Sequence, residues 1–330
     1  MSLKISQRPR RLRKSPATLS LLEETQLSSN DLILPIFVHD GKKLEEIDSM
    51  PGVFRWPLHR LLDQIPIWYE SGIKAFALFP KISSFLKDAN GSAILDSESI
   101  IYEAARKINQ LGLDLILIAD LALDPYTSHG HDGILNHSGN VDNDLTVEML
   151  AKASLVCAES GFHWVAPSDM MDGRVMFIRK ALDQGSYIDT SILAYSAKFC
   201  SAYYGPFRSA IGTCITEKPI DKGGYQLNPA NSREAMRELF LDEIEGADIL
   251  MVKPAEPYLD IIQQAKQSLN TPIAAYQVSG EYSRICAAGK LGWLDENKCA
   301  LESLIAIKRA GADLILSYFA DRLGSLLGGR

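Results

Sequence analysis

Five stretches of the chain repeat one pattern, in which a glycine and two further residues precede an apolar run. Glycine favours the left-handed backbone conformation that ends a helix, and a continuous apolar run is typical of a parallel strand buried on both faces. Each repeat therefore predicts the end of a helix followed by a buried strand. The five stretches are residues 72–80, 112–120, 161–169, 246–254 and 311–319.

Three further apolar runs, at residues 32–38, 191–199 and 272–280, bring the number of expected strands to eight. All but the last expected strand precede a segment that suits a helix. Eight such units predict an α/β fold of the (β/α)8 TIM-barrel type. We expect one barrel domain over residues 31–330 and an extended arm over residues 1–30. The alternative, a doubly wound sheet, would need a glycine-rich phosphate loop that the chain lacks.

Two segments carry additional helix signals. Residues 97–110 begin with Ser97, a residue type that often caps helices. In residues 231–245, Asn231 and Glu234 have the spacing of a capping box, with asparagine in place of the usual serine or threonine. We expect a helix in both segments.

The charge of the chain argues against several classes of partner. Its net charge is −7, so we expect no general attraction to nucleic acid or to an anionic membrane. No apolar run approaches the roughly 20 residues that span a bilayer. A basic stretch at residues 8–14 is the exception, but on an acidic protein it more often forms a subunit contact or a solvated tail. Five scattered cysteines without a CxxC pair and no secretory signal predict a cytoplasmic protein.

Two lysines, Lys198 and Lys253, stand at the ends of two successive apolar runs. In an α/β barrel the carboxyl ends of the strands form the active site. Burial and a second nearby cation both lower the pKa of a lysine, and a neutral amine can form a Schiff base with a carbonyl. The pair therefore predicts amine catalysis, against the alternative of solvated charges at the barrel rim. Other strand ends supply Asp120, Asp124, Ser168, Asp169, Ser279 and Tyr318.

Residues 120–133 contain three aspartates and two histidines. Asp124 and Asp132 could hold a hard cation through oxygen, or could polarise an amine and accept protons. The spacing of His129 and His131 is not diagnostic of a zinc site. The alternative is a polar turn with solvated charges.

The glycine- and proline-rich segment 200–230 is too long for an ordinary connection and predicts a lid over the active site. Its cations and its amide could clamp a substrate carboxylate, while hydroxyl groups at two other strand ends could hold a second one. This pattern indicates two acidic substrates in one pocket. The residues are Arg208, Lys222 and Gln226 for the first carboxylate, and Ser279 and Tyr318 for the second.

Eight motifs occur along the chain in the order of one known family: QRPRRLRKSP, NDLILPIFV, DPYTSHGHDG, VAPSDMMDGR, SAKFCSAYYGPFR, YQLNPAN, LMVKPA and QVSGEY. Through them the chain resembles, over almost its whole length, the porphobilinogen synthase (5-aminolevulinate dehydratase) family. The resemblance implies condensation of two 5-aminolevulinate molecules to porphobilinogen, with loss of two waters, on the route to tetrapyrroles. It further implies that Lys253 and Lys198 each hold one substrate as a Schiff base, and that Asp120 and Ser168 assist in proton transfer and positioning.

The resemblance also assigns the two carboxylate clamps. Ser279 and Tyr318 would hold the substrate bound to Lys253, and Arg208, Lys222 and Gln226 would hold the other. Some family members have arginine at the position of Lys222. Lysine keeps the charge but loses the bidentate fork.

The metal motif departs from that of the zinc-dependent members, which carry three cysteines where this chain has Ala122, Asp124 and Asp132. Alanine cannot ligate a metal, and carboxylates are harder ligands than thiolates. The chain therefore resembles the zinc-independent, magnesium-stimulated branch, and no catalytic zinc is expected. Mg2+, a monovalent cation or no metal at all between Asp124 and Asp132 remain alternatives.

Magnesium-stimulated relatives hold an allosteric Mg2+ through a glutamate on the helix after the fifth strand. Glu238 matches that position, with Asp242 one helical turn further on and Asp172 nearby by resemblance. Mg2+ commonly keeps several waters and needs few carboxylates. The alternative is a solvated acidic helix face.

Family members use the N-terminal extension to wrap a neighbouring subunit, so the resemblance implies a homo-octamer. The arginines of the basic stretch would pair with acidic groups across that interface; they are Arg8, Arg10, Arg11 and Arg13. Two other functions are alternatives. One is a class I Schiff-base aldolase, which generally forms one imine and commonly binds phosphate. The other is a non-enzymatic assembly or nucleic-acid-binding protein that acts through the basic arm.

Overall fold

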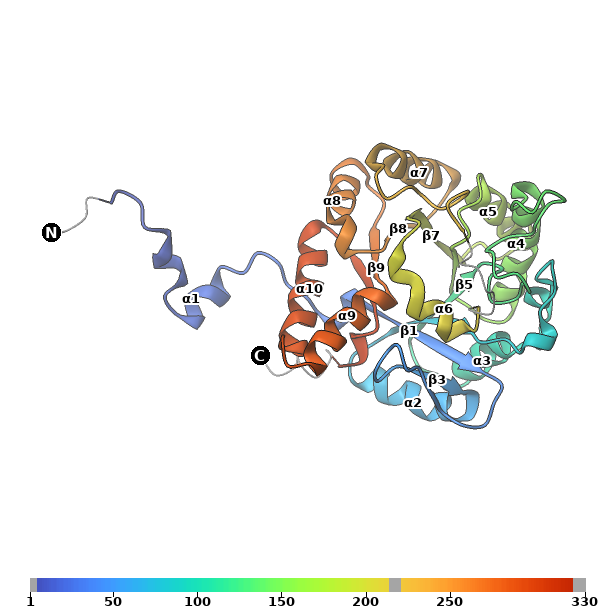
Figure 1. The fold of residues 1–330 in the computed structure, drawn as a ribbon, viewed down its shortest axis with the longest axis horizontal. Coiled ribbons are helices and arrows are strands. Elements are labelled where there is room, and N and C mark those ends of the chain that lie inside the picture. Colours follow the sequence, from blue (N-terminus) through green and yellow to red (C-terminus); the bar gives the residue numbers. More distant parts are fainter. Residues whose placement is uncertain (1–4, 214–220, 323–330) are drawn as a thin grey trace.

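Parallel strands close into a barrel at the centre of the computed structural model, which describes residues 5–213 and 221–322 (Figure 1). Each of its eight strands pairs with the next, and the last strand, β10, pairs with β1 to close the ring. The predicted TIM-barrel fold is therefore confirmed. The strands of the barrel are β1 Leu32–His39, β4 Ala75–Pro80, β5 Ile116–Leu121, β6 Trp164–Pro167, β7 Ser191–Lys198, β8 Ile249–Lys253, β9 Ile273–Gln277 and β10 Leu314–Ser317.

Helices surround the barrel and connect its strands (Figure 1). Both predicted helices are present, as α3 and α7. Two helices have other positions, because α1 lies in the N-terminal arm and α6 lies across the centre of the barrel (Figure 1). The helices are α1 Pro16–Leu21, α2 Leu58–Glu70, α3 Ile100–Asn109, α4 Asn143–Glu159, α5 Arg174–Gln184, α6 Gly205–Ile211, α7 Ser232–Glu245, α8 Leu259–Ser268, α9 Ser279–Lys290 and α10 Glu296–Ala310.

The repeat seen in the sequence corresponds to one structural unit. Gly246 follows the last residue of α7 with a φ of 103°, and β8 begins three residues later. Gly311 has the same place between α10 and β10, with a φ of 123°. Glycine adopts this left-handed conformation without the strain of a side chain. Every residue of β1 and β8 is buried, as expected for strands covered by helices outside and side chains inside.

Two features of local structure differ from the predictions. The cap of α3 is Ser99 rather than Ser97, because the helix begins at Ile100. Asn231 is the N-cap of α7, but its side chain donates a hydrogen bond to the Glu234 carboxylate instead of accepting one from the helix backbone. A capping box is therefore absent at this helix.

Two short strands were not predicted. Strand β3 (Phe54–Pro57) pairs with β1 in parallel, and β2 (Glu45–Glu46) pairs with β3 in antiparallel orientation. They extend the sheet beyond the barrel at β1. Elements of two and four residues are too short to show a hydrophobic period.

The segment 200–230 is partly helical. It contains the 3₁₀ turn η5 (Ala202–Tyr204) and α6, and α6 lies across the centre of the barrel in Figure 1. Residues 214–220 of the predicted lid lie outside the described residues. The segment then returns to the barrel, where the N–H of Leu227 donates to the carbonyl of Lys198 at 3.0 Å. Its position over the barrel mouth suits the predicted lid, whose movement stays a prediction.

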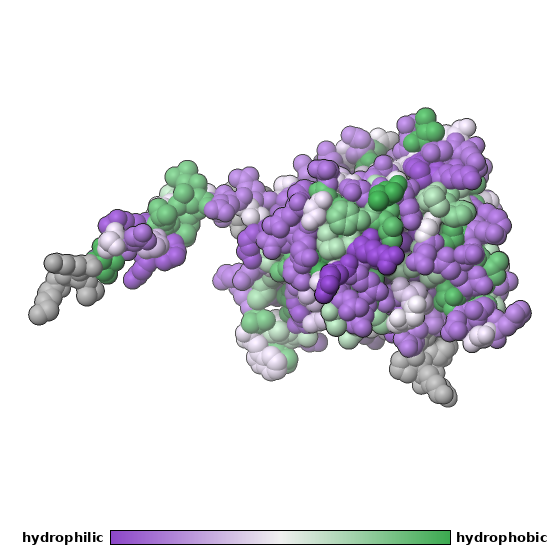
Figure 2. Space-filling model, turned by 90° about the horizontal axis from the view of Figure 1, so that it is seen from above, coloured by the Kyte–Doolittle hydropathy of each residue, from purple (hydrophilic) through white to green (hydrophobic). Residues whose placement is uncertain are grey.

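The N-terminal arm stands away from the barrel (Figures 1 and 2). Neither α1 nor the preceding 3₁₀ helix η1 (Pro9–Arg13) has a buried residue. Leucines of the arm are exposed to solvent, with Leu21 86% exposed and Leu12 57% exposed. Within the described part of the chain, no helix is long and apolar enough to cross a membrane.

Candidate active site

Lys198 and Lys253 lie next to each other at the carboxyl end of the barrel. Strands β7 and β8 pair in parallel, and their register sets Lys198 directly beside Lys253. Each lysine is the last residue of its strand, and the two residues are only 5% and 6% exposed. This end of the barrel is where enzymes of this fold place their active sites. The structure thus brings the two predicted lysines into one buried site.

Four aromatic rings surround the amine of Lys253. Its Nζ lies 4.5 Å from the ring centre of Tyr276 and 4.8 Å from that of Tyr195. The ring centres of Phe207 and Tyr204 follow at 5.3 and 5.4 Å. We call these four rings the aromatic cage. The cage excludes water from the amine and turns ring faces, which attract cations, toward it.

The surroundings of Lys253 favour the neutral form of its amine. Burial and the charge of Lys198 lower the pKa of Lys253 to about 7, while Asp120 acts in the opposite direction. The lowered pKa raises the share of neutral amine at pH 7 far above that of a lysine of ordinary pKa, which is well under one per cent. A neutral amine can attack a carbonyl carbon.

Lys198 has polar surroundings instead of aromatic ones. Its ammonium group donates a hydrogen bond to the backbone carbonyl of Ser168, and its Nζ lies 3.6 Å from Oδ1 of Asp132. The two neighbouring lysines therefore differ in what balances their charge. This difference suits two separate roles within one site.

Asp120, on strand β5, offers a proton acceptor to the site. Burial raises the pKa of Asp120 to about 6, although Lys253 and Lys198 partly offset the rise. Among the described residues, the buried Oδ1 of Asp120 has no hydrogen-bond partner. Ser168 follows the neighbouring strand β6, and its hydroxyl lowers the pKa of Asp120 through a hydrogen bond. A carboxyl group with a free oxygen and a pKa near neutrality can both accept and return a proton.

Asp124 and Asp132 share the ammonium group of Lys222. Nζ of Lys222 lies 3.3 Å from Oδ2 of Asp124 and 3.1 Å from Oδ1 of Asp132, and Gln226 donates to Asp132 at 3.4 Å. Burial alone would raise the pKa of Asp132, but the ammonium groups of Lys198 and Lys222 lower it overall. Burial alone would lower the pKa of Lys222, but Asp124 and Asp132 raise it. The cluster thus favours the charged forms of Asp132 and Lys222, whereas burial and the neighbouring Asp132 raise the pKa of Asp124.

The remaining clamp residues lie on three different elements. Arg208 is in the last turn of α6, and Ser279 is the first residue of α9. Oγ of Ser279 accepts the backbone N–H of Phe207 at 3.0 Å, so α6 and α9 are joined at this point. Tyr318 follows β10, and its hydroxyl lies 2.9 Å from that of Tyr276 in the aromatic cage. Ser279 and Tyr318 thus border the surroundings of Lys253, as their predicted assignment requires.

Several residues of the site were not predicted. The cage residues Tyr195 and Tyr276 lie inside apolar strands, where an aromatic residue is expected to belong to the hydrophobic core. The hydroxyl of Tyr225 lies 3.3 Å from Nδ1 of His131 and accepts the N–H of Asp132 at 3.3 Å. Tyr225 could have been found from the motif YQLNPAN, in which it directly precedes the predicted Gln226.

The donor set at the site does not fit zinc. Ala122 provides no donor, and the carboxylates of Asp124 and Asp132 face the Lys222 ammonium group. Zinc sites prefer thiolate and imidazole ligands. Among the described residues, no three His, Cys, Asp or Glu side chains gather in a metal-binding arrangement.

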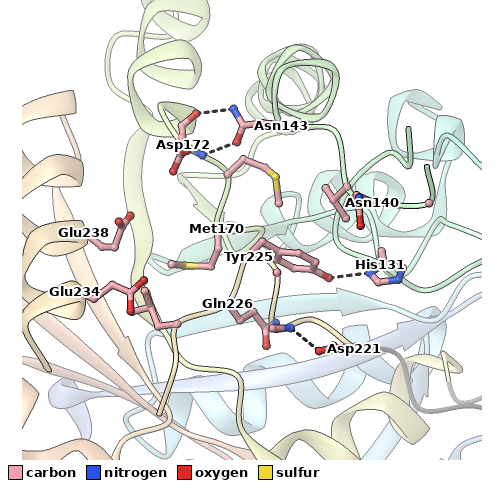
Figure 3. Close-up of a pocket in the computed structure, with 16 residues that line it drawn as sticks. His131, Asn140, Asn143, Met170, Asp172, Asp221, Tyr225, Gln226, Glu234 and Glu238 are labelled. Carbon is pink, nitrogen blue, oxygen red and sulfur yellow. Dashed lines mark hydrogen bonds between the residues drawn. The ribbon is translucent and has the colours of Figure 1, made fainter. Parts of the chain in front are cut away.

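A cavity of about 720 Å3, which we call the second cavity to distinguish it from the pocket of the two lysines, lies beside the site (Figure 3). It carries the carboxylates of Asp172, Glu234 and Glu238. Burial raises the pKa of Glu238, and Asp172 adds to the rise. Asp242, the third predicted metal residue, is instead 2% exposed and pairs with Arg174 through both carboxylate oxygens, at 2.9 and 3.3 Å. Asp172 and Glu238 are therefore the residues of the predicted set that line the cavity.

The lowered pKa of Lys253 predicts its reactivity toward cyanate, which carbamoylates neutral amines. Labelling followed by peptide mass mapping between pH 5 and 10 should give a midpoint near pH 7 for Lys253. Exposed lysines in the same digest serve as the control, and their labelling should still be rising at pH 10, because their pKa lies near 10.4. Lys198→Met should move the Lys253 midpoint upward, because it removes a cation that lowers this pKa. A wild-type midpoint above pH 9 would contradict the assignment.

Comparisons with known proteins agree on one family. The family model for delta-aminolevulinic acid dehydratase matches residues 6–326. The delta-aminolevulinic acid dehydratase of Chlamydia pneumoniae is 51% identical over 327 residues, which cover 99% of this chain and 98% of the relative. A chloroplastic one from Oryza sativa subsp. japonica is 46% identical over 329 residues, covering 99% and 76%.

A solved structure extends this likeness to three dimensions. It is the crystal structure of delta-aminolevulinic acid dehydratase (porphobilinogen synthase) from Toxoplasma gondii ME49 in complex with the reaction product porphobilinogen. It matches with a TM-score of 0.96 and 43% identity, over 98% of this chain and 92% of that one. This chain belongs to the delta-aminolevulinic acid dehydratase family.

Proposed function

We propose that the protein condenses two molecules of 5-aminolevulinate to porphobilinogen, with loss of two waters, in tetrapyrrole synthesis. The observation that carries the proposal is the register of β7 and β8, which sets two buried lysine amines side by side at the barrel mouth. Membership of the family and the likeness to a structure that holds porphobilinogen support it. As the sequence predicts, we place the reaction in the cytoplasm.

Lys253 begins the reaction by attacking the ketone of one substrate. Its neutral amine adds to the carbonyl carbon, and loss of water gives an imine. The aromatic cage suits the protonated imine, because ring faces attract a cation in a site that excludes water. Lys198 forms the second imine with the other substrate. One carbon–carbon and one carbon–nitrogen bond then join the substrates, and both lysines leave as free amines.

Asp120 moves protons between these steps. Burial raises its pKa to about 6, and its buried Oδ1 has no hydrogen-bond partner among the described residues. It can therefore take a proton from a carbon or nitrogen next to the imine and return it later. Ser168, whose hydroxyl bonds to Asp120 and whose carbonyl holds Lys198, orients both groups.

The cations on and after α6 bind the carboxylate of the substrate on Lys198. Lys222 is already desolvated and charged, with Asp124 and Asp132 as its partners. An incoming substrate brings one carboxylate and one ammonium group, so it can exchange partners with this cluster without leaving a buried charge unpaired. Arg208 and Gln226 complete this clamp. Ser279 and Tyr318 hold the carboxylate of the substrate on Lys253.

Borohydride trapping tests the covalent mechanism. Wild-type protein incubated with 5-aminolevulinate and borohydride should carry a reduced adduct on Lys253, with or without one on Lys198, in peptide mass mapping. Lys253→Met should lose its adduct and nearly all formation of the pyrrole, because no other residue replaces the caged amine. Pyrrole is measured by its colour with Ehrlich's reagent.

The same experiment separates the alternatives. An adduct without pyrrole would favour an aldolase. No adduct on either lysine of folded protein supplied with Mg2+ would overturn the proposed reaction.

We also assign the chain to the zinc-independent, magnesium-stimulated branch. Glu238 and Asp172 would hold a largely hydrated Mg2+ in the second cavity, where its charge would favour the ionised form of Glu238. No step of the reaction passes through this ion. The monovalent cation considered between Asp124 and Asp132 would compete with Lys222 for the same oxygens.

Chelation tests this assignment. Protein stripped with EDTA should bind Mg2+ in calorimetry and gain activity when Mg2+ is added, whereas Zn2+ should not replace it. Glu238→Gln should lose both the binding and the gain. Glu234→Gln, on the same helix and in the same cavity, is the matched control and should keep most of both. An unchanged Mg2+ response in Glu238→Gln would contradict the site.

The arm is proposed to assemble the protein into a homo-octamer. Its leucines are exposed on the isolated chain, and four arginines lie beside them. A neighbouring subunit would cover the leucines and offer acidic groups to the arginines. Deleting residues 1–25 should give a smaller particle by light scattering, because the arm has few contacts with its own barrel. An unchanged octamer would contradict this role.

A further inference from the structure

The carboxylate of Glu281 lies where the segments after strands β8 and β9 meet. Glu281 is 0% exposed. Its Oε1 accepts the backbone N–H of Glu256 at 2.6 Å, and its Oε2 accepts those of Val278 at 2.6 Å and Ala255 at 3.4 Å. One side chain thus holds three backbone donors from two separate segments.

Helix capping explains only one of these bonds. Glu281 is the third residue of α9, a position from which glutamate commonly accepts the N–H of the residue before the helix, here Val278. The other two donors lie on the far side, in the segment that follows β8. Ala255 comes two residues after Lys253, and Val278 immediately precedes Ser279. The carboxylate therefore ties the segment after Lys253 to the segment that carries Ser279.

Holding a carboxylate at this place is costly. Removing such a group from water costs several kcal/mol unless partners compensate. Among the described residues, backbone N–H groups and the positive end of α9 supply that compensation, rather than a lysine or arginine. Burial raises the pKa of Glu281 to about 8, and the bonds from Val278 and Ala255 oppose the rise. An apolar residue would fill the space at lower cost but could not link the two segments.

Ser279 is also fixed on its other side. Its Oγ accepts the N–H of Phe207 on α6. Gly280 packs so closely on η5 that an added Cβ would lie 2.5 Å from the carbonyl oxygen of Tyr203. The start of α9 therefore has little freedom, and Glu281 extends this constraint toward Lys253.

We propose that Glu281 is a positioning residue that sets the distance between the Lys253 amine and the Ser279 hydroxyl. The inference rests on the proposed function, in which Lys253 takes the ketone of a substrate and Ser279 takes the carboxylate of the same molecule. The ketone and the carboxylate are separated by only two carbons. A shift of either segment would therefore misalign the attack on the carbonyl while the other end stays bound.

Two ketones test the inference by their rates of reductive trapping on Lys253. The first, 4-oxopentanoate, keeps the ketone and carboxylate of the substrate at the same spacing but has no amino group. The second, butanone, has no carboxylate. The ratio of the two rates in the presence of cyanoborohydride measures how far carboxylate binding helps the attack. Wild-type protein should strongly favour 4-oxopentanoate.

Glu281→Gln should lower this ratio on the order of 10- to 100-fold, while the butanone rate changes less. The amide keeps the size of the side chain, but its NH2 group cannot accept an N–H bond. Glu281→Asp keeps the carboxyl group and both of its acceptor oxygens but is one methylene shorter, so it should recover part of the ratio. If the glutamine variant does not fold, the ratio of the 4-oxopentanoate and butanone rates is measured on the aspartate variant, which should lie below the wild-type ratio.

Glu243→Gln is the matched control. Glu243 accepts the N–H of Thr271 at 3.2 Å where the chain enters β9, at the opposite end of the same strand. This variant should lower the Tm but keep the ratio. A Glu281→Gln variant that only lowers the Tm and keeps the wild-type ratio would overturn the inference. A wild-type protein in which neither 4-oxopentanoate nor 5-aminolevulinate labels Lys253 would overturn the proposed function instead.

Discussion

The pairing of β7 with β8 is the constraint on which the site depends. Its register sets Lys198 and Lys253 side by side in a space without bulk water, where two adjacent ammonium groups repel each other. The surroundings resolve this conflict unequally. Lys198 lies beside Asp132, whereas Lys253 lies among aromatic rings, where burial and the charge of Lys198 lower its pKa to about 7. Two chemically identical side chains thus acquire different properties, which a condensation of two identical substrates into an asymmetric product requires.

Buried contacts connect the site to the outer layer of helices. Arg174 is 1% exposed and donates both to Asp242 on α7 and to the backbone carbonyl of Tyr195 on β7. The ring of Tyr195 belongs to the aromatic cage around Lys253. Glu238 lies one helical turn before Asp242 and lines the neighbouring cavity. The cavity and the cage are therefore attached to the same buried guanidinium group, so a change in α7 position bears directly on the wall of the site.

Local patterns predicted the strands and the two lysines, because glycine stops and apolar runs are properties of a few consecutive residues. Contacts between distant segments were not predictable in this way. The surroundings of Lys253 depend on which strands are neighbours and on the path of α6, and the bonds of Glu281 join residues about 25 positions apart. The sequence suggested that Asp242 is a free carboxylate on a helix face, because its partner, Arg174, lies 68 positions away in the sequence. The sequence has a serine at both 97 and 99, and residue type alone does not show which of them caps α3; the structure shows that it is Ser99.

Lys222 supplies the positive charge between Asp124 and Asp132 from within the chain itself. A bound metal ion exchanges with its surroundings, so a site that depends on one follows the supply of that metal and fails when a scavenger removes it. A side chain is present in every molecule from the moment it folds.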